Sequence, residues 1–280
     1  MALRIVTDST SDIPPKVAQE LGITVIPLYV HFGAEVYRDG IDLCATEFYQ
    51  KLVTSKSLPT TSTISPGEFA ELYDTLSEQT NEILVITLSS KLSATYDAAI
   101  QGQELRKSKG CRVEVIDSRL VLMALGLIVI AAAQEAQAGA SLEQVVDIVK
   151  KALLRVHVRM AFDTLDYVRK GGRIGRAQAF LGTLLSIKPI LTVVEGETTP
   201  VARERTRDRA IEHLRRFAGS FSNIKEMAVE YTTTPEEATA LVRQLDSVFP
   251  EERIYISNVG SVMGTHLGPG ALGIALLEGE

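Results

Sequence analysis

A run of hydroxyl-bearing residues lies between a predicted strand and a predicted helix, and it is the strongest candidate in this sequence for binding an anion. The apolar segment 82–88 is followed directly by Ser89-Ser90-Lys91-Leu92-Ser93, and a helical pattern starts at about Ser93. The first N–H groups of a helix have no intrahelical acceptor, and the helix dipole adds partial positive charge there. Such a helix start binds anions, and a serine adds a hydroxyl donor. A carboxylate suits this junction in its charge and its two acceptor oxygens.

Two further polar segments lie where a strand pattern gives way to a helix. Residues 60–66 are rich in hydroxyls, and Thr61 and Ser62 are neutral donors for an oxyanion, although the segment also reads as a capped loop. Residues 8–15 carry Asp8 and Asp12, which are interpreted either as helix caps or as a metal or phosphotransfer pair. A haloacid-dehalogenase motif needs a second Asp where Thr10 stands, which argues against the phosphotransfer interpretation.

The fourth segment, residues 260–270, is rich in glycine and contains His266. Glycines at this density let a backbone approach a ligand or another loop closely. His266 is the one histidine of four in such a setting, although a purely structural role stays open for it. His31 lies in a strand pattern, whereas His157 and His213 lie in helix-like contexts and are predicted to be surface or packing residues.

Two basic clusters, residues 169–176 and 203–209, interrupt an otherwise acidic chain. A solvated face with local ion pairs explains such clusters in many proteins. Glycines in the first cluster let Arg173 point at a site, and a guanidinium group matches a carboxylate or a phosphate in geometry.

The elements that must position these residues change in type along the chain. Before about residue 120, strand patterns at 3–8, 23–32, 82–88 and 112–117 alternate with helical ones. This alternation predicts a parallel sheet with helices on both faces. The apolar run 120–133 is shorter than the about 20 residues of a membrane-spanning helix. It therefore predicts a helix buried on most sides and no stable membrane insertion.

After about residue 155 the pattern becomes that of a mixed or antiparallel sheet with helices on one face. A hairpin is predicted around residues 195–197, and a helix over 235–248 is predicted to be capped by Thr234. The fold class is therefore α/β with two domains. Residues 1–157 are expected to form a three-layer α/β/α domain with a parallel sheet. Residues 158–280 are expected to form a two-layer α/β domain with a mixed sheet.

Composition argues against several functions. The chain has 280 residues, a net charge of -6 and a pI near 5.4, which argues against a nucleic-acid or anionic-membrane binder. Its two cysteines form no CxxC pattern, so neither a disulfide framework nor a zinc site is predicted. No metal and no cofactor is expected. The N-terminal residues lack the features of a signal peptide, so a cytoplasmic location is the expectation.

Seven segments together resemble the DegV family. They run in order along almost the whole chain: TDSTSDIP (7–14), TSTISPGEF (61–69), SSKLSATY (89–96), VIDS (115–118), KGGRI (170–174), KPIL (188–191) and GTHLGPG (264–270). The resemblance implies two domains with a fatty-acid tunnel between them.

By position, the resemblance implies that Thr61 and Ser93 hold the carboxylate and that His266 lies near it. Arg173 and Arg205 look like the family's basic residues near the tunnel mouth, although the other arginines of 203–209 compete with Arg205 for that match. The family often has Gly where this chain has Ala94, and a methyl group there crowds the helix start.

The resulting hypothesis is a non-enzymatic protein that binds a long-chain fatty acid. The resemblance further implies an ATP-dependent fatty acid kinase subunit as partner, with Arg205 and His266 supporting formation of the acyl phosphate. The alternative is an enzyme like the dihydroxyacetone kinases, which in some cases bind a triose covalently through His; the chain has no Walker-type phosphate loop. A regulatory protein-binding module, suggested by the basic clusters alone, is the third interpretation.

Overall fold

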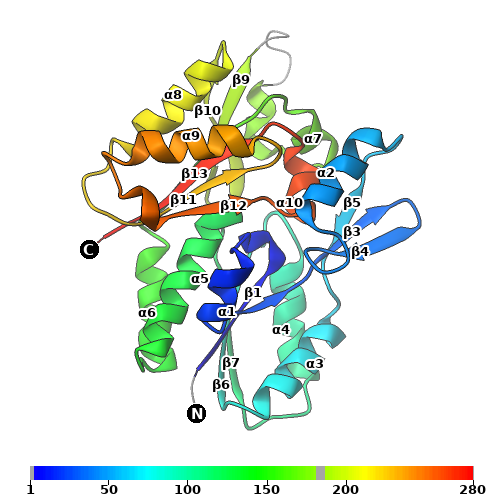
Figure 1. Ribbon diagram of the computed structural model, residues 1–280. Coiled ribbons are helices and arrows are strands. Elements are labelled where there is room, and N and C mark those ends of the chain that lie inside the picture. Colours follow the sequence, from blue (N-terminus) through cyan, green and yellow to red (C-terminus); the bar gives the residue numbers. More distant parts are fainter. Residues whose placement is uncertain (1–2, 181–186, 280) are drawn as a thin grey trace.

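A parallel sheet of four strands forms the lower half of the molecule in Figure 1, in the order β2-β1-β6-β7. The computed structural model describes residues 3–180 and 187–279. The strands of this sheet are β1 (Arg4–Asp8), β2 (Thr24–Ile26), β6 (Glu82–Thr87) and β7 (Arg112–Asp117). The predicted parallel sheet is therefore confirmed.

Helices cover both faces of this sheet, which confirms the three-layer arrangement. One face carries α1 (Pro15–Glu20), α5 (Leu122–Gln137) and α6 (Leu142–Ala152), and the other carries α3 (Pro66–Ser77) and α4 (Thr95–Leu105). Successive side chains of a strand point to opposite faces. Leu84 therefore packs toward α5 and Val85 toward α3 and α4, which explains why this strand is apolar without alternation.

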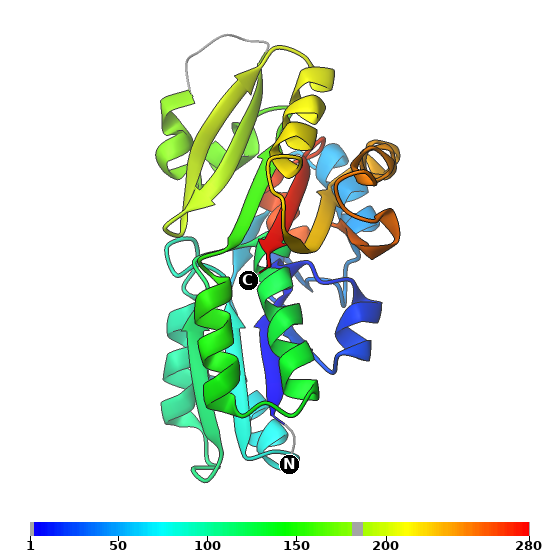
Figure 2. The ribbon, with the colours of Figure 1, turned by 90° about the vertical axis from the view of Figure 1, so that its left-hand side faces the viewer.

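A mixed sheet of six strands forms the other half, in the order β10-β9-β8-β13-β11-β12. Among the described strands of this sheet, β11 and β12 are the one parallel pair of neighbours. The strands are β8 (Val156–Ala161), β9 (Lys188–Val194), β10 (Glu197–Glu204), β11 (Ile224–Tyr231), β12 (Ile254–Asn258) and β13 (Leu272–Glu278). Helices α8 (Arg207–Ala218) and α9 (Pro235–Leu245) cover one face, as predicted. Figure 2 shows this sheet in the upper half of the molecule and the parallel sheet in the lower half, one after the other along the long axis.

The predicted hairpin between β9 and β10 is confirmed. Its two turn residues, Glu195 and Gly196, both have positive φ, at 51° and 83°. Turns of this kind match the right-handed twist of the two strands that they join.

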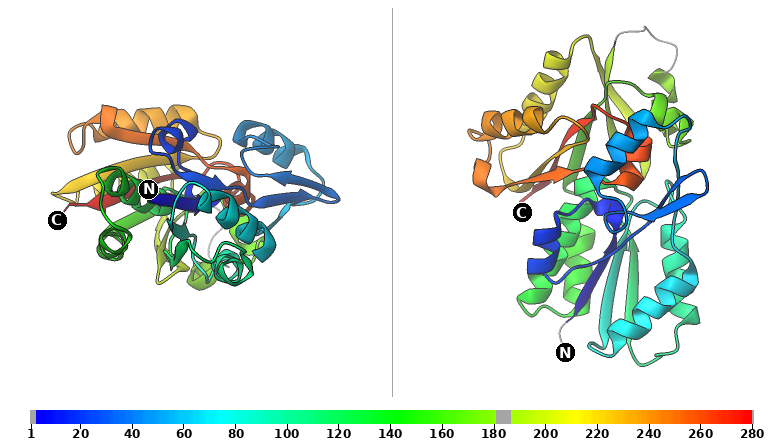
Figure 3. Two further views of the ribbon diagram at one scale, coloured as in Figure 1. Left: turned by 90° about the horizontal axis from the view of Figure 1, so that it is seen from below. Right: turned by 45° about the vertical axis from the view of Figure 1, so that its right-hand side comes forward.

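A small third sheet was not predicted. Strands β4 (Glu35–Arg38), β3 (Tyr29–Phe32) and β5 (Thr60–Ser62) pair antiparallel beside α2 (Ala45–Thr54), at the side of the molecule (Figure 3). The single strand expected over 23–32 is wrong, because it breaks at Pro27 and its halves join different sheets. Proline has no N–H to donate to a ladder, so it interrupts the pairing.

Two other local expectations are wrong. Thr234 stands at the start of α9, but its side chain makes no capping hydrogen bond. His157 lies in strand β8 and not in a helix, and its Nε2 lies 2.8 Å from Glu278 Oε2. No helix in the described ranges is long and apolar enough to cross a membrane.

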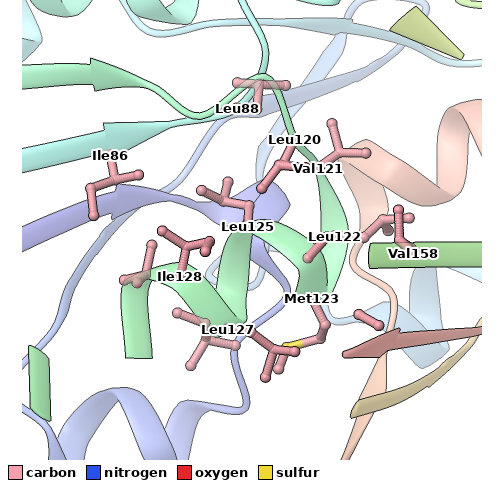
Figure 4. Close-up of a cluster of buried hydrophobic side chains, with 14 of the residues drawn as sticks. Ile86, Leu88, Leu120, Val121, Leu122, Met123, Leu125, Leu127, Ile128 and Val158 are labelled. Carbon is pink, nitrogen blue, oxygen red and sulfur yellow. The ribbon is translucent and has the colours of Figure 1, made fainter. Parts of the chain in front are cut away.

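Helix α5 links the cores of the two sheets. Every residue from Leu122 to Ala133 is buried, because the helix packs against β1 and β6 on one side and β8, β11 and β13 on another. Figure 4 shows part of this cluster, with Leu125 and Ile128 turned toward Ile86. The expectation of a helix buried on most sides is confirmed.

Truncation inside this shared core is expected to be costly. We predict that Ile128→Ala, at a side chain with 0% exposure, lowers the free energy of unfolding by about 2–5 kcal/mol. Val53→Ala, at a side chain that is 64% exposed, should change it by less than about 0.5 kcal/mol. Urea unfolding followed by circular dichroism measures both, and similar values for the two variants would contradict the prediction.

Candidate functional site

A cavity of about 280 Å³ lies between the two large sheets. Its walls come from the junction of β6 and α4, the start of α5, strands β8 and β9, and helix α10 (Ser261–Leu267). One set of lining residues is polar: Thr61, Ser62, Thr63, Ser93, Arg173 and His266. Most of the others are aliphatic or aromatic, among them Leu88, Leu92, Val158, Met160, Phe162 and Leu191. The cavity therefore suits a ligand with a polar head and an apolar body.

Ser93 lies at the junction of β6 and α4, two residues before the helix begins. The expected helix start at Ser93 is therefore early, since residues 89–93 first form a turn in which Ser93 N–H donates to Ser89 O at 3.2 Å. Ser93 Oγ lies 2.9 Å from Thr95 Oγ1, which donates to Thr63 Oγ1 at 2.9 Å. This row of hydroxyls joins the helix start to the segment after β5.

Thr61 and Ser62 are neighbours in β5 and therefore point to opposite faces. Thr61 Oγ1 lies 3.0 Å from His266 Nε2, whereas Ser62 Oγ lies 2.8 Å from Nε2 of the outer residue His31. The structure brings the Thr61 hydroxyl and His266 together and turns the Ser62 hydroxyl away from them. The capped-loop interpretation missed this difference, because it did not recognise a strand.

His266 lies in the last turn of α10, so the glycine-rich segment is partly a helix. Its Nδ1 is buried and has no hydrogen-bond partner within the described chain. A Cβ atom on Gly171 would lie 2.3 Å from this nitrogen, so the absence of a side chain at Gly171 lets the imidazole pack there. Burial, together with the positive charge of Arg173, lowers the pKa of His266 to about 4, so the ring is neutral at physiological pH.

Arg173 supplies a fixed cation beside the polar lining residues. Its Nε donates to Leu92 O at 3.1 Å and its Nη1 to Gly171 O at 2.8 Å. Two carbonyl groups thus orient the guanidinium, whose other N–H groups stay available to an anion. Arg173 lines the cavity, whereas its expected role near a tunnel mouth stays a prediction.

Arg205 is not among the residues that line the cavity. It is exposed between β10 and α8, while its neighbour Arg207 forms an ion pair with Glu237, with Nη2 and Oε2 2.5 Å apart. Arg203 stacks on the ring of Phe180, 4.2 Å from its centroid. Much of this cluster therefore serves local packing and ion pairing.

The start of α10 is held by carboxylates from the other half of the chain. Asp12 Oδ1 accepts from Gly260 N at 2.7 Å, and Asp39 Oδ1 accepts from Ser261 N and Oγ, each at 2.7 Å. Burial is the main cause that raises the pKa of both groups. Asp39 was missed at the sequence level, because it lies in a short turn with no motif around it.

Asp8 also has a structural role. Its carboxylate accepts from Thr10 N at 3.1 Å, which caps the short helix Ser9–Ser11, and from Leu88 N at 2.8 Å. The capping interpretation of this segment therefore fits the structure better than a metal pair. In the two described ranges, no three His, Cys, Asp or Glu side chains are arranged to hold a metal ion.

The fold and this cavity define a class of two-sheet α/β proteins. Proteins of this class have a mostly apolar cavity between the sheets, with polar residues near the junction of β6 and α4. Residues 2–279 match the family model described as "Uncharacterised protein, DegV family". This chain belongs to the DegV family.

This chain aligns with known relatives over nearly the whole length of both proteins. A DegV domain-containing protein of Deinococcus radiodurans is 38% identical over 281 residues, covering 99% of this chain and 98% of that protein. Two solved structures cover 99–100% of both chains. One is a DegV family protein from Thermus thermophilus, described by its fatty acid binding, with a TM-score of 0.90 and 34% identity. The other is DegV from Bacillus subtilis, described as a fatty acid binding protein, with a TM-score of 0.89 and 33% identity.

The low pKa of His266 predicts a pH effect on stability. Its folded-state pKa, about 4, lies below the ordinary value of 6.5, so the unfolded chain binds more protons between these values. Stability is complete above the ordinary pKa and falls as the pH drops toward the folded-state pKa. Lowering the pH from 7 to 5 should cost wild type about 2 kcal/mol more than His266→Gln, because one pKa unit corresponds to about 1.4 kcal/mol. Urea unfolding at both pH values tests this, and equal losses in the two proteins contradict it.

Proposed function

We propose that this protein binds one long-chain fatty acid, with its tail in the cavity between the sheets. The observation that carries the proposal is the cavity lining, in which hydroxyls, His266 and Arg173 adjoin a wall of apolar side chains. The descriptions of the relatives from Thermus thermophilus and Bacillus subtilis support it. We further propose that residues 1–157 and 158–280 are the two domains and that the lipid lies between them.

The tail supplies most of the affinity in this proposal. Each buried CH₂ contributes about 0.8 kcal/mol, so the tail of a sixteen-carbon acid contributes roughly 12 kcal/mol before ordering costs. Met160 and Met263 line the cavity and have flexible side chains that adapt to an apolar surface. The head group then needs only orientation and hydrogen bonds.

The carboxylate lies at the polar residues in this proposal. Thr61 and Ser93 donate hydroxyl hydrogen bonds, His266 acts as a neutral ring beside Thr61, and Arg173 supplies the positive charge. Ser62 contributes through its place in the lining and not through its hydroxyl, which contacts His31. This arrangement orients the carboxylate for attack on a phosphoryl group brought by another protein.

The partner in this proposal is an ATP-dependent fatty acid kinase subunit, and the chain itself carries out no chemistry. A cytoplasmic location is part of the same proposal. The triose-kinase alternative is less well supported, because most of the lining is apolar. A covalent bond through His266 is also disfavoured, since Thr61 contacts Nε2 and Gly171 packs against Nδ1.

Loss of either hydroxyl should weaken lipid retention. Thr61→Ala and Ser93→Ala each remove a donor to the carboxylate, which costs about 1 kcal/mol or more, or at least fivefold in affinity. Native mass spectrometry of the purified variants measures the fraction that carries fatty acid. Thr75→Ala, which removes an exposed hydroxyl on α3, is the matched control. Full occupancy with fatty acid in both site variants would refute the assignment of Thr61 and Ser93 as donors to the carboxylate.

Arg205 is proposed to act with the kinase partner and not in lipid binding, because it is exposed and lies outside the cavity lining. Arg205→Ala should keep its bound fatty acid and slow acyl-phosphate formation by tenfold or more, a range typical of lost charge contacts at an interface. His266→Ala should also slow this reaction. Arg209→Ala, an exposed neighbour in the same cluster, is the control. Normal rates with the Arg205 and His266 variants would refute the assignment.

A further inference from the structure

Leu122 has a backbone conformation that leucine rarely adopts. It is the first residue of α5, its φ is 61°, and its side chain is 4% exposed and lines the cavity. A bulky residue in the left-handed region is a genuine outlier. Such strain persists only where the surroundings enforce it, and it concentrates at ligand sites.

A buried carboxyl group fixes this turn. Met123 N–H donates to Oε2 of Glu230 at 2.8 Å, and Glu230 lies in β11 with 0% exposure. Burial raises the pKa of Glu230 to about 8, so the group is largely protonated at neutral pH. Because Val121 is still extended, at φ −151°, the chain turns sharply between Val121 and Met123. Figure 4 shows Leu122 at the end of α5 that faces Val158.

We infer that Leu122 is a specificity-determining residue for the acyl tail and that Glu230 is the positioning residue that holds it. This inference rests on the proposed fatty-acid binding. Met160 and Met263 can yield to a tail through side-chain rotation, whereas Leu122 is held by a hydrogen-bonded backbone turn. Leu122 therefore limits the length of straight-chain fatty acid that the cavity accepts.

The first test compares two deletions of equal size in one helix. Leu122→Ala opens space in the cavity, whereas Leu127→Ala opens it in a fully buried position outside the cavity lining. The dissociation constants of hexadecanoic and octadecanoic acid are measured for each delipidated protein. Leu122→Ala should shift their ratio toward the longer acid by about fifteenfold, since the two acids differ by two methylenes and each buried methylene contributes roughly fourfold. Leu127→Ala should leave the ratio within about twofold of wild type. Equal ratios in the two variants overturn the role of Leu122.

The second test separates positioning by Glu230 from general stability. Glu230→Gln keeps an acceptor oxygen for Met123 N–H and resembles the protonated carboxyl, so it should keep the wild-type ratio. Glu230→Ala removes the acceptor and should shift the ratio severalfold in the direction of Leu122→Ala. A wild-type ratio in Glu230→Ala, or the same shift in both Glu230 variants, overturns the positioning role.

The third test measures the strain and needs no ligand. Glycine adopts positive φ freely, whereas alanine does not. Leu122→Gly should therefore melt about 2–4 °C above Leu122→Ala, the reverse of the usual order in a helix. A higher melting temperature for Leu122→Ala contradicts the strain. If wild type binds neither acid, the proposed function fails, and this comparison still decides whether the turn is strained.

Discussion

The burial of α5 between two sheets is the constraint on which the architecture depends. A helix that is apolar on all sides must be covered on all sides. The parallel sheet covers one side of α5 and the six-stranded sheet covers another, so one core runs through both halves. The same packing fixes where α5 starts, and its N-cap residue Val121 and first residue Leu122 contribute to the cavity wall. The cavity is thus a space that this shared helix leaves beside its own N-terminus.

Buried hydrogen bonds also connect the two halves of the chain. Asp12 and Asp39 follow strands of the N-terminal half, yet they accept hydrogen bonds from the first residues of α10 in the other half. Burying carboxylates is costly unless hydrogen bonds satisfy them, so these contacts tolerate few other arrangements. They set the start of α10, and His266 follows in its last turn, within reach of Thr61. The geometry of the polar lining therefore depends on Asp12 and Asp39, which do not line the cavity themselves.

The sequence was sufficient where one physical signal dominated. The segment 82–88 had to be a central strand, because it is apolar toward both faces, and the run 120–133 had to be a buried helix. It was insufficient where neighbouring residues decided the outcome. The orientation of Ser62 depends on its pairing with β3. Within the basic cluster, Arg207 forms an ion pair with the distant Glu237, whereas Arg205 is exposed. Asp39 and Leu122 gave no local signal. Asp39 accepts a hydrogen bond from the distant helix α10, and the turn at Leu122 is fixed by the bond from Met123 N to Glu230 in β11.

The apolar and the polar residues of the lining have different roles in binding. Apolar walls bind a tail without regard to its orientation, because burial of apolar surface is not directional. Direction must come from the polar residues, which carry little charge. The imidazole of His266 is neutral, and among the described lining residues only Arg173 is cationic. A fully paired carboxylate would be held more tightly but would be a poorer nucleophile. In the proposed function, a weakly polar head site beside an apolar wall keeps the bound acid reactive for transfer to the partner.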